Sequence, residues 1–218
     1  MGSKRVAWGT WVWIVVALAV ILSTGLAAGW LLQRYDQQRG FDAEATKIAT
    51  ILKLAPGKTV ADVLAGSGKW SVDLSRRVGP SGRVFSTESG PGQVARLRDA
   101  VAKPDLTNIE VLESTDTDSG LQSGCCDAIL VRAAYHDLND RQAFNVGLRR
   151  ALRAGGLMAI IEYDQGTQEY QSGHGIGRTR LIDELTAAGF TVDHIIETWS
   201  GHAYCVLFRH DNTPTTGH

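Results

Sequence analysis

The chain has 218 residues, of which 44% are hydrophobic and 21% are charged. This length fits one domain, or one domain with a short appendage, and the composition excludes a disordered chain and a membrane protein with several spans. The net charge is −1, so no nucleic acid is expected as the main partner. The three cysteines form neither a spaced, even set nor a zinc pattern, which favours a reducing compartment for the folded part.

The N-terminal segment predicts a membrane anchor. No charged residue occurs from Val6 to Leu32. As a helix with a rise of about 1.5 Å per residue, this run is longer than the roughly 30 Å hydrocarbon core of a bilayer. Aromatic residues suited to the membrane–water interfaces gather at its two ends, and they are Trp8, Trp11, Trp13, Trp30 and Tyr35. We therefore expect one transmembrane helix within residues 1–32.

The same segment has a second interpretation, a cleavable signal peptide that begins with Lys4 and Arg5. Its apolar stretch is long for a signal peptide and no Ala-x-Ala site follows directly, so an uncleaved single-pass anchor is the favoured prediction. Positive residues follow the segment at Arg34, Arg39 and Lys47, which favours a cytoplasmic-facing C-terminal domain. An exported domain is the alternative.

The rest of the chain predicts one α/β domain. Residues 33–42 indicate a polar linker, residues 43–210 the domain, and residues 211–218 a disordered tail. Strands and helices alternate, which is typical of a mostly parallel sheet. Strands are expected at 59–64, 83–86, 109–112, 128–131 and 157–161, and helices at 43–54, 70–78, 93–103, 141–153 and 178–188. The last strands, 191–197 and 202–208, are joined by too few residues for a crossover helix and must pair antiparallel.

A turn rich in small residues follows the first strand. The segment TVADVLAGSGKW, residues 59–70, runs from a strand through this turn into a helix. Small residues let the backbone approach a ligand closely, and the following helix N-terminus offers free N–H groups. Glu88 ends the second strand, where a carboxylate can accept hydrogen bonds from both hydroxyls of a ribose. The pattern predicts a ligand that contains a nucleoside.

Two common nucleotide-binding motifs do not match this turn. A dinucleotide turn requires glycine where Ser71 stands, and a P-loop requires Ser or Thr where Trp70 stands. From about Ala43 to Arg209 the chain instead resembles the class I S-adenosylmethionine-dependent methyltransferases. The segments that carry the resemblance are LAPGKTVADVLAGSGKW, GRVFSTE, CCDAILVRAAYHDL, LRRALRAGGLMAIIEYD, ELTAAGF and the final hairpin. The YHDL element looks closest to a predicted bacterial methyltransferase branch whose members often carry an N-terminal export or anchor segment.

The resemblance implies a Rossmann-like seven-stranded sheet with an antiparallel C-terminal hairpin, and S-adenosylmethionine as the cofactor. The cofactor-binding residues that it implies are Asp62, Ala65, Gly66, Ser67, Gly68, Glu88, Asp116 and Arg132. Among them Asp62 would organise the first turn, Glu88 would hold the ribose, and Asp116 would meet the adenine amino group. A count without gaps places Thr115 there instead of Asp116. Ala133 would line the cofactor beside Arg132.

The acceptor side is less defined, because methyl transfer depends chiefly on positioning and needs a base only when the acceptor carries a proton. His136, just past the fourth strand, is the candidate base or substrate-orienting group, and a loop histidine bonded to the backbone is the alternative. Glu162 to Asp164 are expected to form a solvated strand end, with contact to the substrate as the alternative. His174 is expected to be a linker histidine, with a mobile lid as the alternative. Cys125-Cys126 is expected to pack rather than react. No metal-ligand spacing is present.

One departure from the family pattern bears on function. Leu64 stands where the family commonly has the first glycine of G-x-G-x-G, and its side chain would crowd the cofactor. The expected function is S-adenosylmethionine-dependent methyl transfer to a small-molecule or lipid-like acceptor by a membrane-anchored enzyme. The first alternative is a catalytically inactive nucleoside-binding or interaction scaffold, which Leu64 favours. The second is a nicotinamide-dependent oxidoreductase, which the missing third glycine and the antiparallel end disfavour.

Overall fold

The computed structural model describes residues 7–210, and between residues 7 and 28 it describes the whole backbone but only some of the side chains. The chain divides into two compact units, Met1–Glu44 and Ala45–His218. In the first unit the described residues form one helix, the N-terminal part of α1 (Ala7–Ile51). The tail predicted at 211–218 and the first six residues of the predicted anchor lie outside the described residues.

Helix α1 runs without a break through residues 33–42, which the sequence predicts as a linker. Side chains four positions apart contact each other there, and such contacts stabilise helical backbone. The Arg34 guanidinium lies 4.6 Å from the centroid of the Trp30 ring, and Gln38 donates a hydrogen bond to Asp42 at 2.7 Å. The transmembrane helix expected within residues 1–32 is not found: among the residues that the structure describes, no helix is both long and apolar enough to cross a membrane.

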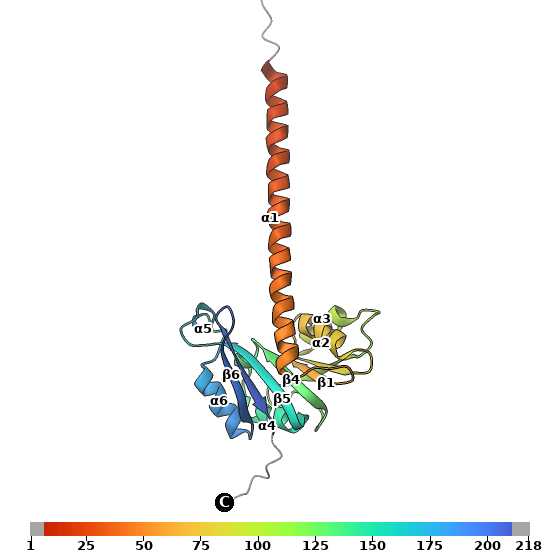
Figure 1. The fold of residues 1–218 in the computed structure, drawn as a ribbon, viewed down its shortest axis with the longest axis vertical. Helices are drawn as coiled ribbons and strands as arrows, with labels where there is room; N and C mark the ends of the chain where they lie inside the picture. The colour runs from red at the N-terminus through yellow and green to blue at the C-terminus, as the bar shows by residue number, and fades with distance from the viewer. Residues whose placement is uncertain (1–6, 211–218) are drawn as a thin grey trace, which may run out of the picture. The chain divides into compact units, whose positions relative to one another are not determined.

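The second unit is built on a seven-stranded sheet in the order β3-β2-β1-β4-β5-β7-β6, which confirms the predicted sheet. Figure 1 shows this unit with β1, β4, β5 and β6 labelled. The strands are β1 (Thr59–Val63), β2 (Arg83–Ser89), β3 (Ile109–Ser114), β4 (Cys126–Arg132), β5 (Leu152–Tyr163), β6 (Thr191–Ser200) and β7 (Ala203–Arg209). β1 to β5 pair in parallel, and β7 pairs antiparallel with β5 and with β6. The carboxyl ends of the five parallel strands therefore meet at one edge of the sheet.

Helices cover both faces of the sheet. They are α2 (Lys69–Val78), α3 (Pro91–Val101), α4 (Arg141–Ala151), α5 (Gln168–Gln171) and α6 (Arg178–Ala187), with a 3-10 turn η1 (Tyr135–Asp137). Ile129 and Val131 of β4 pack in one core cluster with side chains of α4 and α6. Ala128 and Leu130 pack in another cluster with side chains of α2 and the end of α1. Because successive side chains of a strand point to opposite faces, the result is a helix–sheet–helix sandwich.

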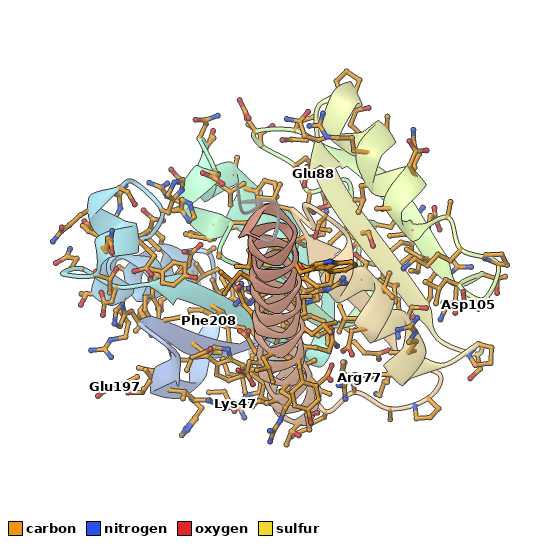
Figure 2. The ribbon with its side chains drawn as sticks, turned by 90° about the horizontal axis from the view of Figure 1, so that it is seen from above. Lys47, Arg77, Glu88, Asp105, Glu197 and Phe208 are labelled. Carbon is orange, nitrogen blue, oxygen red and sulfur yellow. A yellow bond between two sulfur atoms is a disulfide. The ribbon has the colours of Figure 1, made fainter. Side chains whose placement is uncertain are left out.

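The last turns of α1 belong to this sandwich and are attached to β6. The Nζ atom of Lys47, a residue labelled in Figure 2, donates to the carbonyl oxygen of Trp199 at 3.0 Å. The same atom lies 4.0 Å from the centroid of the Trp199 ring. Ala45, Ile48 and Leu52 are buried. A cation over an indole contributes about 0.5–1 kcal/mol at exposed sites, so most of the attachment comes from the buried apolar side chains.

Two local features differ from the sequence predictions. β5 already begins at Leu152, because Leu152 pairs with Cys126 ahead of an irregularity in the β4–β5 ladder. Cys126 is buried in the core as expected, but its sulfur is bonded to that of Cys125, so the pair is a disulfide between adjacent residues rather than two packed thiols. The periodic patterns used for the prediction do not report on the oxidation state of neighbouring cysteines.

Candidate functional site

A cavity of about 400 Å³ opens at the carboxyl ends of β1, β2 and β4. The strand order reverses between β1 and β4, the point at which open α/β sheets bind ligands. Of the predicted cofactor residues, Ala65, Gly66, Glu88, Asp116 and Arg132 line it. A larger groove, of about 770 Å³, lies between α4 and α6, away from these strand ends. Its Arg141 and Arg180 side chains both pair with Glu184, so these charges are already engaged.

The two glycines of the turn have different roles. A Cβ on Gly66, which has φ +54°, would meet no atom within 4 Å, so Gly66 leaves space on the cavity side. A Cβ on Gly68, which has φ +71°, would lie 2.8 Å from Val101 Cγ1 and 2.9 Å from Leu97 Cδ1 of α3. Gly68 does not line the cavity and instead allows α2 to begin close against α3. Ser67 does not line it either.

Leu64 has a backbone conformation that favours glycine. Its φ is +57°, and Ala133, at the end of the neighbouring strand β4, has φ +50°. Left-handed backbone costs a residue with a Cβ about 1–2 kcal/mol. Both residues line the cavity. Strain of this kind persists where the surrounding structure holds it and is enriched at ligand sites.

Glu88 joins the glycine turn to the end of β2. Its Oε2 accepts a hydrogen bond from the Gly66 N–H at 2.8 Å, and its Oε1 accepts one from the Ser89 N–H at 2.9 Å. These bonds hold the carboxylate at the cavity wall. A carboxylate oxygen accepts more than one hydrogen bond, so the Glu88 oxygens can also accept hydrogen bonds from ligand hydroxyls.

Asp62 lies beneath the cavity rather than in its wall. The carboxylate is buried in β1, and its Oδ2 accepts a hydrogen bond from Ser71 Oγ in α2 at 2.5 Å. Burial raises its pKa to about 6, and the hydrogen bonds from Ser71 oppose that shift. Asp62 therefore ties β1 to the first turn of α2 and fixes the turn between them.

The far wall of the cavity combines an acid, an arginine and an indole. Thr115 and Asp116 both line it, but the Thr115 hydroxyl already accepts hydrogen bonds from the N–H groups of Thr117 and Asp118. Among residues 7–210, no group hydrogen-bonds to the Asp116 carboxylate, which leaves it to accept from a ligand. The Arg132 guanidinium lies 5.1 Å from the centroid of the Trp70 ring. Trp70 also lines the cavity. From the sequence, its side chain serves only as an argument against a P-loop.

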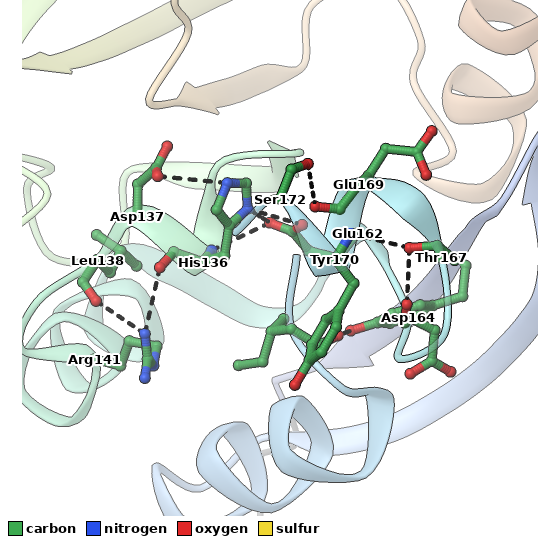
Figure 3. Close-up of polar contacts among 12 residues, drawn as sticks. His136, Asp137, Leu138, Arg141, Glu162, Asp164, Thr167, Glu169, Tyr170 and Ser172 are labelled. Carbon is green, nitrogen blue, oxygen red and sulfur yellow. Dashed lines mark hydrogen bonds and ion pairs between the residues drawn. The ribbon is translucent and has the colours of Figure 1, made fainter. Parts of the chain in front are cut away.

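His136 is not among the residues that line the cavity, but its neighbour Asp137 is. Figure 3 shows the contact between these two side chains. The Nδ1 atom of His136 lies 3.0 Å and 3.1 Å from the two carboxylate oxygens of Glu162, and its Nε2 lies 3.4 Å from Asp137 Oδ1. The hydrogen bond that His136 donates to Glu162 raises the pKa of His136, burial lowers it, and the charges of Glu162 and Asp137 add to the rise. The partner of this histidine is thus a carboxylate rather than the backbone carbonyl of the alternative interpretation.

The prediction that Glu162 belongs to a solvated strand end is wrong. Its side chain is fully buried, because it shares a face of β5 with Met158 and Ile160, which pack in the core. The period-2 pattern contained this signal. His174 also approaches the site, with its ring centroid 5.8 Å from that of His136 at an interplanar angle of 77°.

The residues around the cavity fit S-adenosylmethionine. Glu88 offers an acceptor for ribose hydroxyls, Asp116 an acceptor for an amino group, and Arg132 a cation for a carboxylate. Gly66 leaves open space beside them, and the volume lies within the 300–1,000 Å³ of small-molecule sites. Leu64 lines this space without filling it. A parallel sheet with this strand order, an antiparallel end and such a turn defines a Rossmann-like methyltransferase.

Comparisons with known proteins agree with this class. A family described as "Methyltransferase domain" matches residues 61–160. A demethylmenaquinone methyltransferase of Listeria monocytogenes is 23% identical over 115 residues, 53% of this chain and 48% of that protein. The chain thus spans about half the length of the curated relatives it matches. An arsenite methyltransferase of Halobacterium salinarum is 27% identical over 112 residues, 51% of this chain and 29% of that protein.

Among solved structures, a SAM-dependent methyltransferase from Aquifex aeolicus superposes with a TM-score of 0.69. Its sequence identity is 24%, with 75% of this chain and 88% of that one covered, so the likeness concerns the fold. In sequence and in fold the chain is similar to the class I S-adenosylmethionine-dependent methyltransferases, whose methyl donor is S-adenosylmethionine.

Proposed function

We propose that this chain transfers the methyl group of S-adenosylmethionine to a small-molecule acceptor at the carboxyl edge of its sheet. The observation that carries the proposal is the convergence of Gly66, Glu88, Asp116 and Arg132 on one cavity between β1 and β4. When bound, S-adenosylmethionine supplies a methyl group on a positively charged sulfur. Glu88 then accepts hydrogen bonds from the ribose hydroxyls, Asp116 accepts from the adenine amino group, and Arg132 pairs with the methionine carboxylate.

The acceptor is proposed to be a molecule whose reacting group carries a proton. His136 would take that proton on Nε2, and the methyl group would pass from the sulfur of S-adenosylmethionine to the acceptor. The Asp137 side chain, which is 69% exposed, lies 3.4 Å from Nε2 and turns towards solvent when the acceptor enters. The proposal is supported by the relatives named as demethylmenaquinone methyltransferases, because a reduced quinone has ionisable hydroxyl groups.

We also propose that the chain is attached to a membrane, and this part of the proposal rests on the sequence alone. The uncharged run from Val6 to Leu32, with aromatic residues at both ends, supports it. A lipid-like acceptor would suit such an enzyme, and the catalytic domain would face the cytoplasm. In fractionated cells, the full chain is expected to stay with membranes after alkaline extraction, whereas a chain that begins at Gln33 is not. Recovery of the full chain in the supernatant would refute attachment.

The test of the function is methyl transfer by the full chain from S-adenosylmethionine with a labelled methyl group. The acceptors are 1,4-naphthohydroquinone, a phenol panel and arsenite, and the product is identified by mass. We expect labelled naphthohydroquinone, and a rate about 100-fold lower for His136→Gln at neutral pH. Binding of S-adenosylmethionine without transfer to any acceptor would support the inactive scaffold, the second candidate, which the position of Leu64 in the cavity wall favours.

A further inference from the structure

Glu162 is a buried carboxylate with an unusual partner. Its side chain, at the end of β5, is 0% exposed. Both oxygens face the Nδ1 atom of His136, and Oε1 also accepts a hydrogen bond from the His136 backbone N–H at 3.3 Å. Within the described residues 7–210, no lysine or arginine pairs with it. Among the described residues, His136 is the one cationic partner that pairs with Glu162.

A carboxylate withdrawn from water is costly unless it is paired and hydrogen-bonded. This requirement fixes the tautomer of the His136 imidazole, because only a ring with a proton on Nδ1 can donate a hydrogen bond to Glu162. In its neutral form the ring then carries its lone pair on Nε2, the atom that faces Asp137 at the cavity wall. A carboxylate that holds a histidine in one tautomer and stabilises its charged form is a recurrent way to prepare a base.

The other groups around the ring do not replace Glu162. Asp137 of η1 approaches Nε2 at 3.4 Å but is mostly exposed. Arg141 of α4 donates to the carbonyl oxygens of His136 and Leu138 and forms an ion pair with Glu184, so its charge is directed away from the ring. His174 meets the ring edge-on. Glu162 and Asp137 raise the pKa of His136, and the charge of Arg141 lowers it.

We propose that Glu162 is the positioning residue of His136, holding Nδ1 as a hydrogen-bond donor so that Nε2 faces the acceptor end of the cavity. The role in catalysis rests on the proposed function, in which His136 receives the acceptor's proton. The arrangement of the ring itself does not depend on that function. Glu162 touches neither the cavity nor a ligand and acts through the imidazole alone.

The test is a nitrogen-15 NMR titration of the histidine rings in the full chain, with His136→Gln used to assign the His136 signal. In the wild-type chain we expect the neutral ring to carry its proton on Nδ1 and the titration midpoint to lie above the ordinary value of about 6.5. In Glu162→Gln, which keeps the size of the side chain and removes its charge, the midpoint falls below that of the wild type. The control Glu169→Gln removes a carboxylate that lies near His202 instead and leaves the His136 midpoint unchanged.

A proton on Nε2 in the wild-type chain would overturn the proposal, and this measurement needs no variant. An unchanged midpoint in folded Glu162→Gln would overturn it as well. S-adenosylmethionine binding by Glu162→Gln, followed by calorimetry, is expected to stay within about twofold of the wild type. If the wild-type chain does not bind S-adenosylmethionine, the proposed function fails while the NMR result still decides the role of Glu162.

Discussion

The site consists of two halves that are built differently. The β1–β2 half, Leu64 to Gly68 with Glu88, is made of backbone, small residues and one carboxylate already held by N–H groups. The β4–β5 half, Arg132 to Leu138 with Glu162, is made of ionisable side chains that contact one another. The first half suits a ligand of constant shape, because its geometry is fixed by the turn. The second half can change charge with its surroundings, which suits a reacting group.

Two groups beside the cavity, Asp62 beneath the glycine turn and His136 beyond β4, lose stabilising free energy as the pH rises, but in different pH ranges. The pKa of Asp62 is about 6 in the folded chain against 3.8 for the free side chain, so between these values the folded state binds more protons than the unfolded state. Stability therefore falls as the pH rises from about 4 to 6. The pKa of His136 is raised above 6.5, so its contribution is complete below that pH and is lost as the pH rises through the folded value.

The largest expected effect distinguishes Gly68, which packs against α3, from Gly66, which borders the cavity. Gly68→Ala places a Cβ against α3 and keeps a positive φ, so we expect a loss of about 3 kcal/mol in the free energy of unfolding. Gly66→Ala, its matched control, adds only the φ strain of about 1 kcal/mol but lowers affinity for S-adenosylmethionine. Chemical denaturation and calorimetry measure the two quantities. Equal stability of both variants would contradict the assigned roles.

The second prediction concerns the buried acid under the turn. Asp62→Asn removes the charge that burial disfavours, so the stability of the variant relative to the wild type should rise by about 2–3 kcal/mol between about pH 4 and pH 7. Denaturation curves for both proteins across this range give the difference. A difference that does not change with pH would show that Asp62 titrates at its ordinary value.

The third prediction isolates the ribose acceptor. Glu88→Gln should weaken S-adenosylmethionine binding at least tenfold, about 1.4 kcal/mol, because a charged acceptor is lost. Glu113→Gln is the matched control, since Glu113 lies opposite Glu88 in the β2–β3 ladder and does not contact Gly66. The same loss in both variants would indicate a general effect of charge rather than a specific contact.

The smallest expected effect tests the strain at Leu64. Leu64→Gly should be more stable than Leu64→Ala by about 1 kcal/mol, because alanine keeps the Cβ that a left-handed backbone disfavours. At an ordinary position the order is the reverse. If alanine is the more stable of the two, Leu64 does not hold a positive φ in solution.

The sheet and most of the β1–β2 half could be predicted from sequence, because strand periodicity and a glycine turn are local signals. Gly66 and Glu88 follow from the order of elements alone. The contact between His136 and Glu162 is harder to predict, because the two residues are 26 positions apart in the chain and belong to different elements. The polar end of the strand favours a solvated Glu162, whereas the alternation of side chains along β5 places it on the inner face, where it is buried. The positive φ of Leu64 required the structure, since a leucine gives no sign of it.

The central claim is that the cavity between β1 and β4 binds S-adenosylmethionine despite Leu64. The most direct measurement is a calorimetric titration of the full chain with S-adenosylmethionine and S-adenosylhomocysteine, with NADH as the control ligand. We expect micromolar binding of both sulfur compounds, none of NADH, and a loss of at least tenfold in Glu88→Gln. Failure of the folded chain to bind either sulfur compound would contradict the claim and make the inactive scaffold the better description.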